Sequence, residues 1–343
     1  MLALQAVTAE ALCARLPGLE QDHARKLLST VHREDALAPR PGLPRTAIER
    51  VCESAGEPRL TRAGEQASAD GFHKYLFEVE PGRIETVSIP LDRPGRYSVC
   101  VSSQVGCALS CTFCATGRLG LARNLDTWEI VEQVREVRRR LPDGARIHGV
   151  VFQGMGEPLA NADRVLAAVD VLTAPYTQAI DARAVTICTA GVPEGIHRLA
   201  RSAPRVRLGL SIGSARSAVR ETIMPITRAH SLASVLAAAA EHATTTGLAP
   251  MWAITLLAGV NDGDDEARAL AVLVRDFADR TGLAPRLTVL DYNPIDVDGR
   301  DPFARSPRMD AFRDALAAAG VHSHRRYSGG ADIAAACGQL AGA

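Results

Sequence analysis

Three cysteines within one short stretch constrain this chain more than any other feature of its sequence. They are Cys107, Cys111 and Cys114, in the spacing Cys-x3-Cys-x2-Cys. Soft thiolate sulfurs are the ligands that iron takes in iron–sulfur clusters, and a short loop can wrap one cluster. Three ligands leave one iron of a four-iron cluster without a protein partner, and an open coordination position is where a metal centre performs chemistry. The spacing therefore predicts a 4Fe–4S cluster with one iron open to a reactant.

Two other interpretations of these cysteines remain open. They could bind zinc together with a distant histidine, or they could be small buried hydrophobic residues. The spacing is unusual for zinc, which favours paired cysteines, so we prefer the cluster.

Length and composition are those of an ordinary globular protein. The chain has 343 residues, 47% of them hydrophobic and 23% charged, which suffices for a large core and a small additional domain. Its eight cysteines are too sparse and too clustered for a disulfide scaffold, so we expect metal ligands and reactive thiols in a reducing cytoplasm. With no signal peptide or long apolar run visible, we expect no membrane partner, and a monomer is our default. The zero net charge argues mildly against RNA without excluding it.

The first 80 residues are predicted to form a separate, small helical domain. Helical periodicity covers residues 9–16, 21–32 and 46–55, and prolines interrupt the chain between the last two. A short β extension to about residue 95 follows, with strands at 74–79 and 84–89 around the turn Pro81-Gly82.

From about residue 96 the pattern changes to strand and helix in repeated alternation. The predicted strands cover 97–103, 147–153, 184–189, 206–212, 251–257 and 287–292. They are rich in Val, Ile and Leu with weak alternation, which is typical of parallel strands covered on both faces. Six such units predict an α/β fold, a partial (β/α)6 TIM-like barrel over 96–328, with chemistry at the carboxyl ends of its strands. The C-terminal segment 329–343 is predicted to hold a short helix containing Cys337.

Small polar motifs follow several of these predicted strands. The stretch GMGEP at 154–158 lets backbone approach a ligand closely, and Glu157 can accept hydrogen bonds from an ammonium group. Taken singly, each motif is as well explained by a turn or a helix cap. Their common place on one rim makes the motifs at 154–158, 186–191, 211–215 and 293–294 candidate cofactor contacts.

Several segments together resemble the RlmN/Cfr family of radical S-adenosylmethionine (SAM) RNA methyltransferases. They are IETV at 84–87, CVSSQVGC at 100–107, FCATG at 113–117, RNL at 123–125, GMGEPL at 154–159 and ACGQLAG at 336–342. The likeness runs from about residue 4 to the C-terminus and is weaker in the first 70 residues. It implies that the N-terminal domain contacts RNA, either ribosomal or transfer RNA.

The resemblance implies methylation of carbon-2 or carbon-8 of an adenosine, with two SAM molecules used per turnover. One methylates Cys337, and the radical made from the second at the cluster removes a hydrogen from that methyl group. The carbon radical adds to adenine, Glu85 accepts a proton, and Cys100 attacks the sulfur of Cys337 to release the product. The resemblance also implies six SAM contacts, namely Gly156, Glu157, Cys188, Ser211, Gly213 and Asn293, and an electron donor such as flavodoxin or ferredoxin. A nucleophilic thiol and a resolving thiol outside the cluster loop are consistent with this chemistry.

Three positions depart from the family pattern. The usual Ser-Leu-His after the fourth strand is Ser211-Ile212-Gly213, the usual serine after the third strand is Cys188, and an acidic pair is reduced to Ala331-Asp332. Two alternatives stay open. A radical SAM methylase of a small natural product is slightly favoured by the zero net charge and the changed residues after the fourth strand. The other is a non-enzymatic iron–sulfur redox sensor, against which the intact Cys100, Cys337 and Glu85 argue. The choice between carbon-2 and carbon-8 is not readable, because both branches of the family share these motifs.

Overall fold

An open, ten-stranded sheet organises the structure, a computed structural model that describes residues 2–37, 41–295 and 301–342. The strand order is β14-β13-β12-β11-β10-β9-β6-β5-β4-β3. The strands from β6 to β14 in this order are mutually parallel. Their bounds are Arg96–Cys100 (β6), Arg146–Phe152 (β9), Val185–Thr189 (β10), Arg207–Ser211 (β11), Met251–Leu256 (β12), Arg286–Asp291 (β13) and Ser323–Arg326 (β14).

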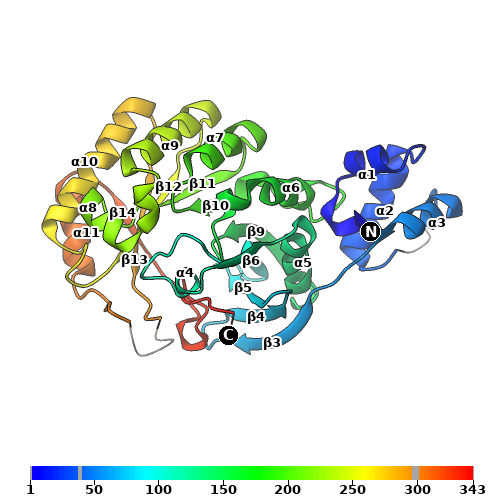
Figure 1. Ribbon diagram of the computed structural model, residues 1–343, viewed down its shortest axis with the longest axis horizontal. Coiled ribbons are helices and arrows are strands. Elements are labelled where there is room, and N and C mark those ends of the chain that lie inside the picture. Colours follow the sequence, from blue (N-terminus) through cyan, green and yellow to red (C-terminus); the bar gives the residue numbers. More distant parts are fainter. Residues whose placement is uncertain (1, 38–40, 296–300, 343) are drawn as a thin grey trace.

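Helices cover the outer face of the parallel strands, which confirms the predicted partial barrel (Figure 1). The strands supply the apolar inner layer of the core, for example Val150, Ile187 and Leu208, each almost fully buried. The covering helices are Thr127–Arg138 (α5), Ala162–Thr173 (α6), Pro193–Ser202 (α7), Leu232–Thr246 (α9), Asp264–Thr281 (α10) and Met309–Ala318 (α11). Short elements join them: Ser217–Ile223 (α8), Pro158–Asn161 (η2), Ala182–Ala184 (η3) and Pro225–Arg228 (η4).

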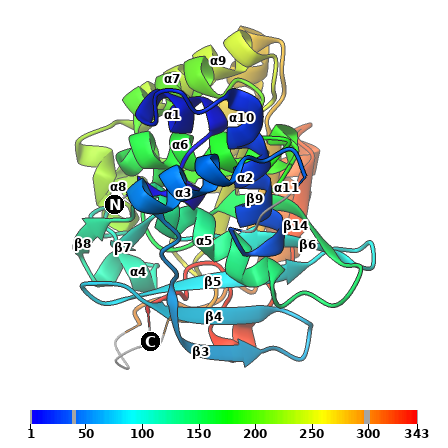
Figure 2. The same cartoon turned by 90° about the vertical axis from the view of Figure 1, so that its right-hand side faces the viewer.

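Three antiparallel strands extend the sheet on the side of β6 (Figure 2). They are β3 (Thr61–Ala67), β4 (His73–Glu78) and β5 (Arg83–Pro90). The sequence analysis missed β3, because its polar, largely exposed residues lack an apolar face. An exposed edge strand of this kind is held by its neighbour's backbone rather than by burial.

The N-terminal helices form a small unit with its own apolar core. They are α1 (Ala9–Arg15), α2 (Gln21–Glu34) and α3 (Arg45–Ser54), accompanied by η1 (Leu4–Ala6) and the short pair β1 (Leu2–Ala3) and β2 (Ala55–Gly56). Leu12, Leu27 and Val51 are fully buried at its centre. The helices lie beside α5 and α6, at one end of the molecule (Figure 1).

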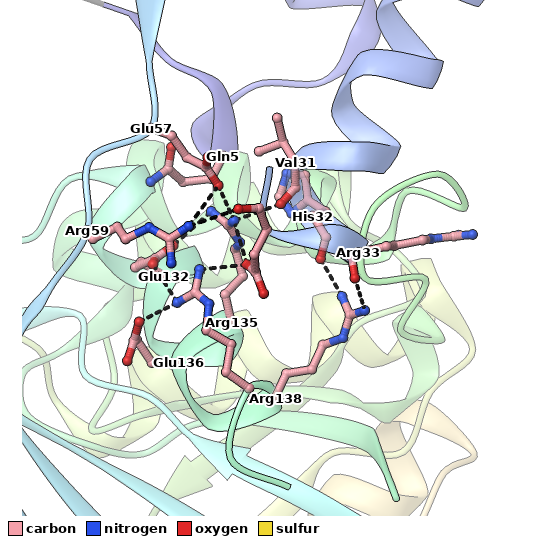
Figure 3. Close-up of polar contacts among 12 residues, drawn as sticks. Gln5, Val31, His32, Arg33, Glu57, Arg59, Glu132, Arg135, Glu136 and Arg138 are labelled. Carbon is pink, nitrogen blue, oxygen red and sulfur yellow. Dashed lines mark hydrogen bonds and ion pairs between the residues drawn. The ribbon is translucent and has the colours of Figure 1, made fainter. Parts of the chain in front are cut away.

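Buried charges join this helical unit to α5 (Figure 3). Arg135 of α5 is 1% exposed and forms ion pairs with Asp35 and Glu132, each at 2.9 Å, and with Glu57. It also donates a hydrogen bond to the backbone oxygen of Val31, at 2.7 Å. The carboxylates contributed by the helical unit and its linker therefore neutralise an arginine that the barrel buries.

A hairpin and the C-terminal tail complete the rim at the carboxyl ends of the strands. The hairpin pairs β7 (Gln104–Gly106) with β8 (Leu121–Asn124), and α4 (Ala115–Arg118) lies between them. The tail contains η5 (Ala331–Ile333), but Cys337 lies in a turn, so the predicted helix around it is wrong. Ala334 adopts a left-handed backbone (φ 51°), which ends the single helical turn before Cys337.

Candidate active site

The cysteine loop lies between β7 and α4 and is closed by its own backbone. Cys107 N–H donates to Gly120 O at 2.8 Å, and Cys114 N–H donates to Cys111 O at 3.2 Å. Gly106 has a φ of +75°, and a Cβ there would collide with Gly120 O, so only glycine fits this closure. Burial is the main reason that the pKa of each cluster cysteine is raised, to about 11 for Cys107.

A cavity of about 160 Å³, the cluster cavity, is lined by both these cysteines and the predicted cofactor residues. It is lined by the three loop cysteines and by Cys337. Five of the six candidate SAM contacts also line it, namely Gly156, Glu157, Cys188, Ser211 and Gly213. The residues come from the ends of separate strands, so the sheet collects at one rim what the sequence separates.

The turn after β9 depends on close backbone approach. A Cβ on Gly154 would lie 2.6 Å from Val101 O, and Gly156 has a φ of +100°. Glu157 is 3% exposed, and burial is the main reason that its pKa is raised. Its two carboxylate oxygens accept hydrogen bonds from Leu159 N–H (3.0 Å) and Ala190 N–H (2.9 Å). A carboxylate has about four lone-pair sites, so it retains acceptors for a ligand ammonium.

Gly213, in a left-handed backbone, stands after β11 where the family usually has a histidine. Gly213 has a φ of +70°, and a Cβ there would collide with the sulfur of Met224. Met224 lines the same cavity and is itself 1% exposed. The thioether of Met224 therefore lies beside Gly213, the position at which the family usually has the imidazole of a histidine.

The tail holds Cys337 at this cavity through several hydrogen bonds. Asn293 donates from its amide to Cys337 O and to Ser328 Oγ, each at 3.2 Å. Cys337 N–H donates to Ser328 Oγ at 3.0 Å, and Ala115 N–H donates to Gly338 O at 2.7 Å. Asn293 thus binds Cys337, which lines the cluster cavity, but does not line that cavity itself, and its predicted role in binding SAM stays a prediction.

A second cavity, of about 310 Å³, is also lined by Cys337. Cys100, at the end of β6, lines this cavity together with Cys188 and Cys337. Burial raises the pKa of Cys100, and the neighbouring Cys337 thiol raises it further. Burial likewise raises the pKa of Cys188, to about 12. Cys337, Cys188 and Gln153 line both this cavity and the cluster cavity, so these three residues lie at the boundary between the two.

Glu85 does not line either cavity, because the tail occupies its carboxylate. Its Oε2 accepts hydrogen bonds from the backbone N–H groups of Ala341 (2.7 Å) and Gly342 (3.2 Å). Its Oε1 forms an ion pair with Lys74 Nζ at 2.9 Å, and Glu85 is 1% exposed. The structure thus places Glu85 against the tail segment that follows Cys337.

The donor set fits an iron–sulfur cluster better than a single metal ion. In the described residues, no three His, Cys, Asp or Glu side chains converge as they would around one ion. A mononuclear zinc site draws its sulfurs to about 2.3 Å from one ion, whereas a cluster of several irons spreads its thiolates apart. Three cysteine side chains on one closed loop, facing one cavity, suit the second arrangement.

Comparison with known proteins shows the family. The sequence model of the radical SAM superfamily matches residues 101–271. A probable RNA methyltransferase of Sorangium cellulosum is 55% identical over 347 residues, covering 94% of this chain and 88% of the relative. The dual-specificity RNA methyltransferase RlmN of Anaeromyxobacter dehalogenans is 37% identical, and the match covers 98% of this chain and 91% of the relative. The chain belongs to the RlmN/Cfr family of radical SAM enzymes.

A solved structure agrees with this family assignment. The crystal structure of a radical SAM methyltransferase from Sphaerobacter thermophilus has a TM-score of 0.89 and 34% identity, and the match covers 100% of both chains. As an RlmN/Cfr-family enzyme, the protein is a methyltransferase that uses a 4Fe–4S cluster and SAM. None of the helices in the described ranges combines the length and apolarity needed to cross a bilayer.

Two residues of this RlmN/Cfr-family site were not found by sequence analysis. Lys74, the ion-pair partner of Glu85, is a single lysine in a predicted strand and carries no motif. Arg326 lines the cavity that contains Cys100, Cys188 and Cys337. In the sequence it lies between the last barrel helix and the tail motif. The sequence signal that could have indicated Arg326 was a positively charged residue at the carboxyl end of the last strand. Such a signal is weak until the order of the strands in the sheet is known.

Proposed function

We propose that this enzyme methylates a ring carbon, C2 or C8, of an adenosine in ribosomal or transfer RNA, with Cys337 as the methyl carrier. One observation carries the proposal: of the two thiols in the described ranges that line both the cavity of the cluster cysteines and the cavity that contains Cys100, namely Cys188 and Cys337, Cys337 is the one in the family's tail motif ACGQLAG. A carrier thiol must meet a methyl donor on one side and a resolving thiol on the other. The names of the relatives support RNA as the substrate and favour an enzyme over a redox sensor.

The proposed roles of the protein residues follow from their positions. Cys107, Cys111 and Cys114 would hold the cluster, and Gly156, Glu157, Cys188, Ser211, Gly213 and Asn293 would contact or support SAM. When bound, the cluster and SAM supply methyl groups and one-electron cleavage chemistry. Glu157 would accept hydrogen bonds from the ammonium of SAM through the lone pairs that Leu159 and Ala190 leave open.

The release step is assigned to Cys100. As a thiolate it attacks the sulfur of Cys337 in the adduct, and a sulfur–sulfur bond forms. The bond between that sulfur and the transferred methylene carbon breaks, and this carbon keeps the electron pair and takes up a proton to become the methyl group. The resulting disulfide must then be reduced by two electrons and two protons from an external thiol. Glu85 is the proposed proton acceptor, and its bonds to Ala341 and Gly342 mean that the tail must shift before its Oε2 is open to substrate.

Nucleoside mass spectrometry tests the proposal directly. RNA from cells expressing the wild-type enzyme should contain a methyladenosine that is absent with Cys337→Ala and present with Cys52→Ala, which changes an exposed cysteine of α3. Unchanged modification in every RNA fraction would contradict the proposal. If the reduced enzyme cleaves SAM but methylates no RNA, a small-molecule substrate is indicated instead.

The Cys100 role has a separate readout. Cys100→Ala should accumulate a covalent protein–RNA adduct, visible as a ribonuclease-sensitive mobility shift in a denaturing gel. The double variant Cys100→Ala/Cys337→Ala should form none, because the carrier sulfur is gone. An adduct that persists in the double variant would place the covalent bond on another residue. We further propose that the enzyme acts in the cytoplasm as a monomer, with flavodoxin or ferredoxin as its electron donor.

A further inference from the structure

A fully buried arginine, Arg220, lies behind the wall of the cluster cavity. It belongs to α8 and is 0% exposed. Its Nε donates a hydrogen bond to Ile212 O at 2.8 Å, and its Nη2 donates to Ala190 O at 2.6 Å. Ile212 directly precedes Gly213, and Gly213 and Ala190 both line the cavity. The guanidinium therefore contacts the backbone that forms the cavity wall after β10 and β11.

The helix that carries Arg220 also contacts the cysteine loop. At the C-terminal end of α8, the backbone oxygen of Ile223 accepts hydrogen bonds from Thr112 N–H (3.0 Å) and Thr112 Oγ1 (3.4 Å). Thr112 directly follows Cys111, and Cys111 packs against the apolar cluster that contains Ile223. Residues three apart on a helix share a face, so α8 brings Arg220 to the same side as Ile223.

Within the described ranges, no carboxylate pairs with the charge of Arg220. Its third hydrogen bond runs from Nη1 to Thr227 Oγ1 at 2.7 Å, and this partner is neutral as well. Arginine keeps its charge in proteins, and a buried charge is costly unless an opposite charge lies close to it. Burial lowers the pKa of Arg220, and the Cys111 sulfur opposes this shift. The three hydrogen bonds thus solvate the guanidinium without neutralising it, and the cysteine loop is a neighbour that can.

We propose that Arg220 is a positioning residue whose buried charge balances the thiolate-ligated cluster and makes that cluster easier to reduce. The inference rests on the proposed function only in taking Cys107, Cys111 and Cys114 as the cluster ligands, and it holds for any methylated substrate. Reduction adds one electron from an external donor, and hence one negative charge, to the cluster. A fixed cation in a buried, low-dielectric setting stabilises that added charge and raises the reduction potential.

A redox titration measures the effect of this charge without any turnover. Enzyme with a reconstituted cluster is kept anaerobic and free of SAM, and it is titrated with dithionite in the presence of redox mediators. Electron paramagnetic resonance follows the reduced cluster. In Arg220→Met the equilibrium constant for one-electron reduction should fall about tenfold, which lowers the midpoint potential by about 59 mV. A midpoint equal to that of the wild type would overturn the proposal.

Matched variants separate charge from hydrogen bonding. Arg220→Lys keeps the cation but loses the planar fork, and its midpoint should stay close to that of the wild type. Thr227→Val removes one partner of the guanidinium without changing a charge, and it should also titrate like the wild type. Arg228→Gln changes a 73% exposed arginine that pairs with Glu221, and it serves as the surface control. An equal fall in Arg220→Lys and Arg220→Met would overturn the proposal, because it would indicate packing rather than charge.

The carboxylate of SAM is another negative charge that a buried arginine would attract. The titration contains no SAM, so this carboxylate cannot contribute to the measured midpoint. Equilibrium binding of SAM to the oxidised, cluster-loaded Arg220→Met then separates the two partners. Weakened binding together with an unchanged midpoint would assign the cation to SAM and overturn the proposal.

Iron content decides the case in which Arg220→Met assembles no cluster. Arg220→Lys should then still take up as much iron as the wild type, whereas its failure to do so would overturn the proposal in favour of packing. Wild-type protein that binds no iron would overturn this inference together with the proposed function. A lowered midpoint in Arg220→Met, beside a wild type that forms no methyladenosine, would support this inference and reject the proposed substrate.

Discussion

Lys74 and Glu85 form an ion pair inside the antiparallel extension of the sheet, with 2.9 Å between Nζ and Oε1. Their side chains are 7% and 1% exposed, and the second oxygen of Glu85 accepts from Ala341 and Gly342. One carboxylate therefore joins β4, β5 and the tail that follows the carrier cysteine. As the proposed proton acceptor, Glu85 would link substrate entry to movement of the C-terminus, because the same carboxylate anchors the tail.

Replacing Lys74 by methionine tests this anchor. The change removes the cation and leaves Glu85 buried without its counter-charge, which costs about 3–5 kcal/mol when a buried pair is broken. We expect a loss of this order in the free energy of unfolding, measured by urea denaturation. The control is Lys26→Met, whose pair with Asp22 is exposed (39% and 69%) and should contribute less than about 1 kcal/mol. Equal losses in both variants would contradict the account.

Arg135 is expected to hold the helical unit against the barrel (Figure 3). In Arg135→Met, Glu132 stays fully buried with one fewer cation beside it. We therefore expect the free energy of unfolding to fall by about 3 kcal/mol or more. Limited proteolysis should then cut the linker near residues 55–60 faster than in the wild type. Arg45→Met, which changes an exposed i,i+4 pair, is the control. Resistance of the Arg135 variant to cleavage would show that apolar contacts suffice to dock the unit.

His32 predicts a pH dependence of stability. Its side chain is 1% exposed, and burial, aided by Arg135 and Arg138, lowers its pKa to about 3. The folded state therefore holds it neutral while the unfolded state protonates below about pH 6.5, so stability is lost as the pH falls from 6.5 toward 3. The slope contributed by this one group approaches about 1.4 kcal/mol per pH unit.

Denaturation of His32→Gln at several pH values isolates this contribution. The difference in unfolding free energy between wild type and variant should shift in favour of the variant as the pH is lowered. His322→Gln changes an exposed histidine and should run parallel to the wild type. A constant difference between wild type and His32→Gln across this range would refute the assignment.

Gly154→Ala should weaken SAM binding while leaving the fold intact. The added Cβ would lie 2.6 Å from Val101 O, which is backbone, so the turn that carries Gly156 and Glu157 must move. We expect at least a tenfold rise in the dissociation constant, about 1.4 kcal/mol, measured by equilibrium binding to the cluster-loaded enzyme. Gly64→Ala, where a Cβ meets only Leu76 at 3.8 Å, is the control. Unchanged affinity in Gly154→Ala would remove this turn from the SAM site.

Sequence reasoning failed where distant residues compete with local propensity. The alanines at 334–336 favour a helix, yet Asn293 and Ser328 bind the backbone around Cys337 and hold it in a turn. Strand β3 was missed for the complementary reason, since its backbone pairs with β4 although its side chains carry no apolar pattern. In both cases tertiary hydrogen bonds outweighed the preference of the segment itself.

The sequence by itself determined the features that are encoded within a single contiguous segment. Cys107, Cys111 and Cys114 share one loop, so their spacing alone indicates a cluster, and the repeated apolar runs alone indicate parallel strands covered by helices. Only the tertiary structure decided which charges meet in the interior. Lys74 with Glu85, and Arg326 with the three thiols, are brought together by strand order and by the path of the tail. No local pattern encodes such pairs, because their stability comes from shared burial and not from neighbouring positions in the chain.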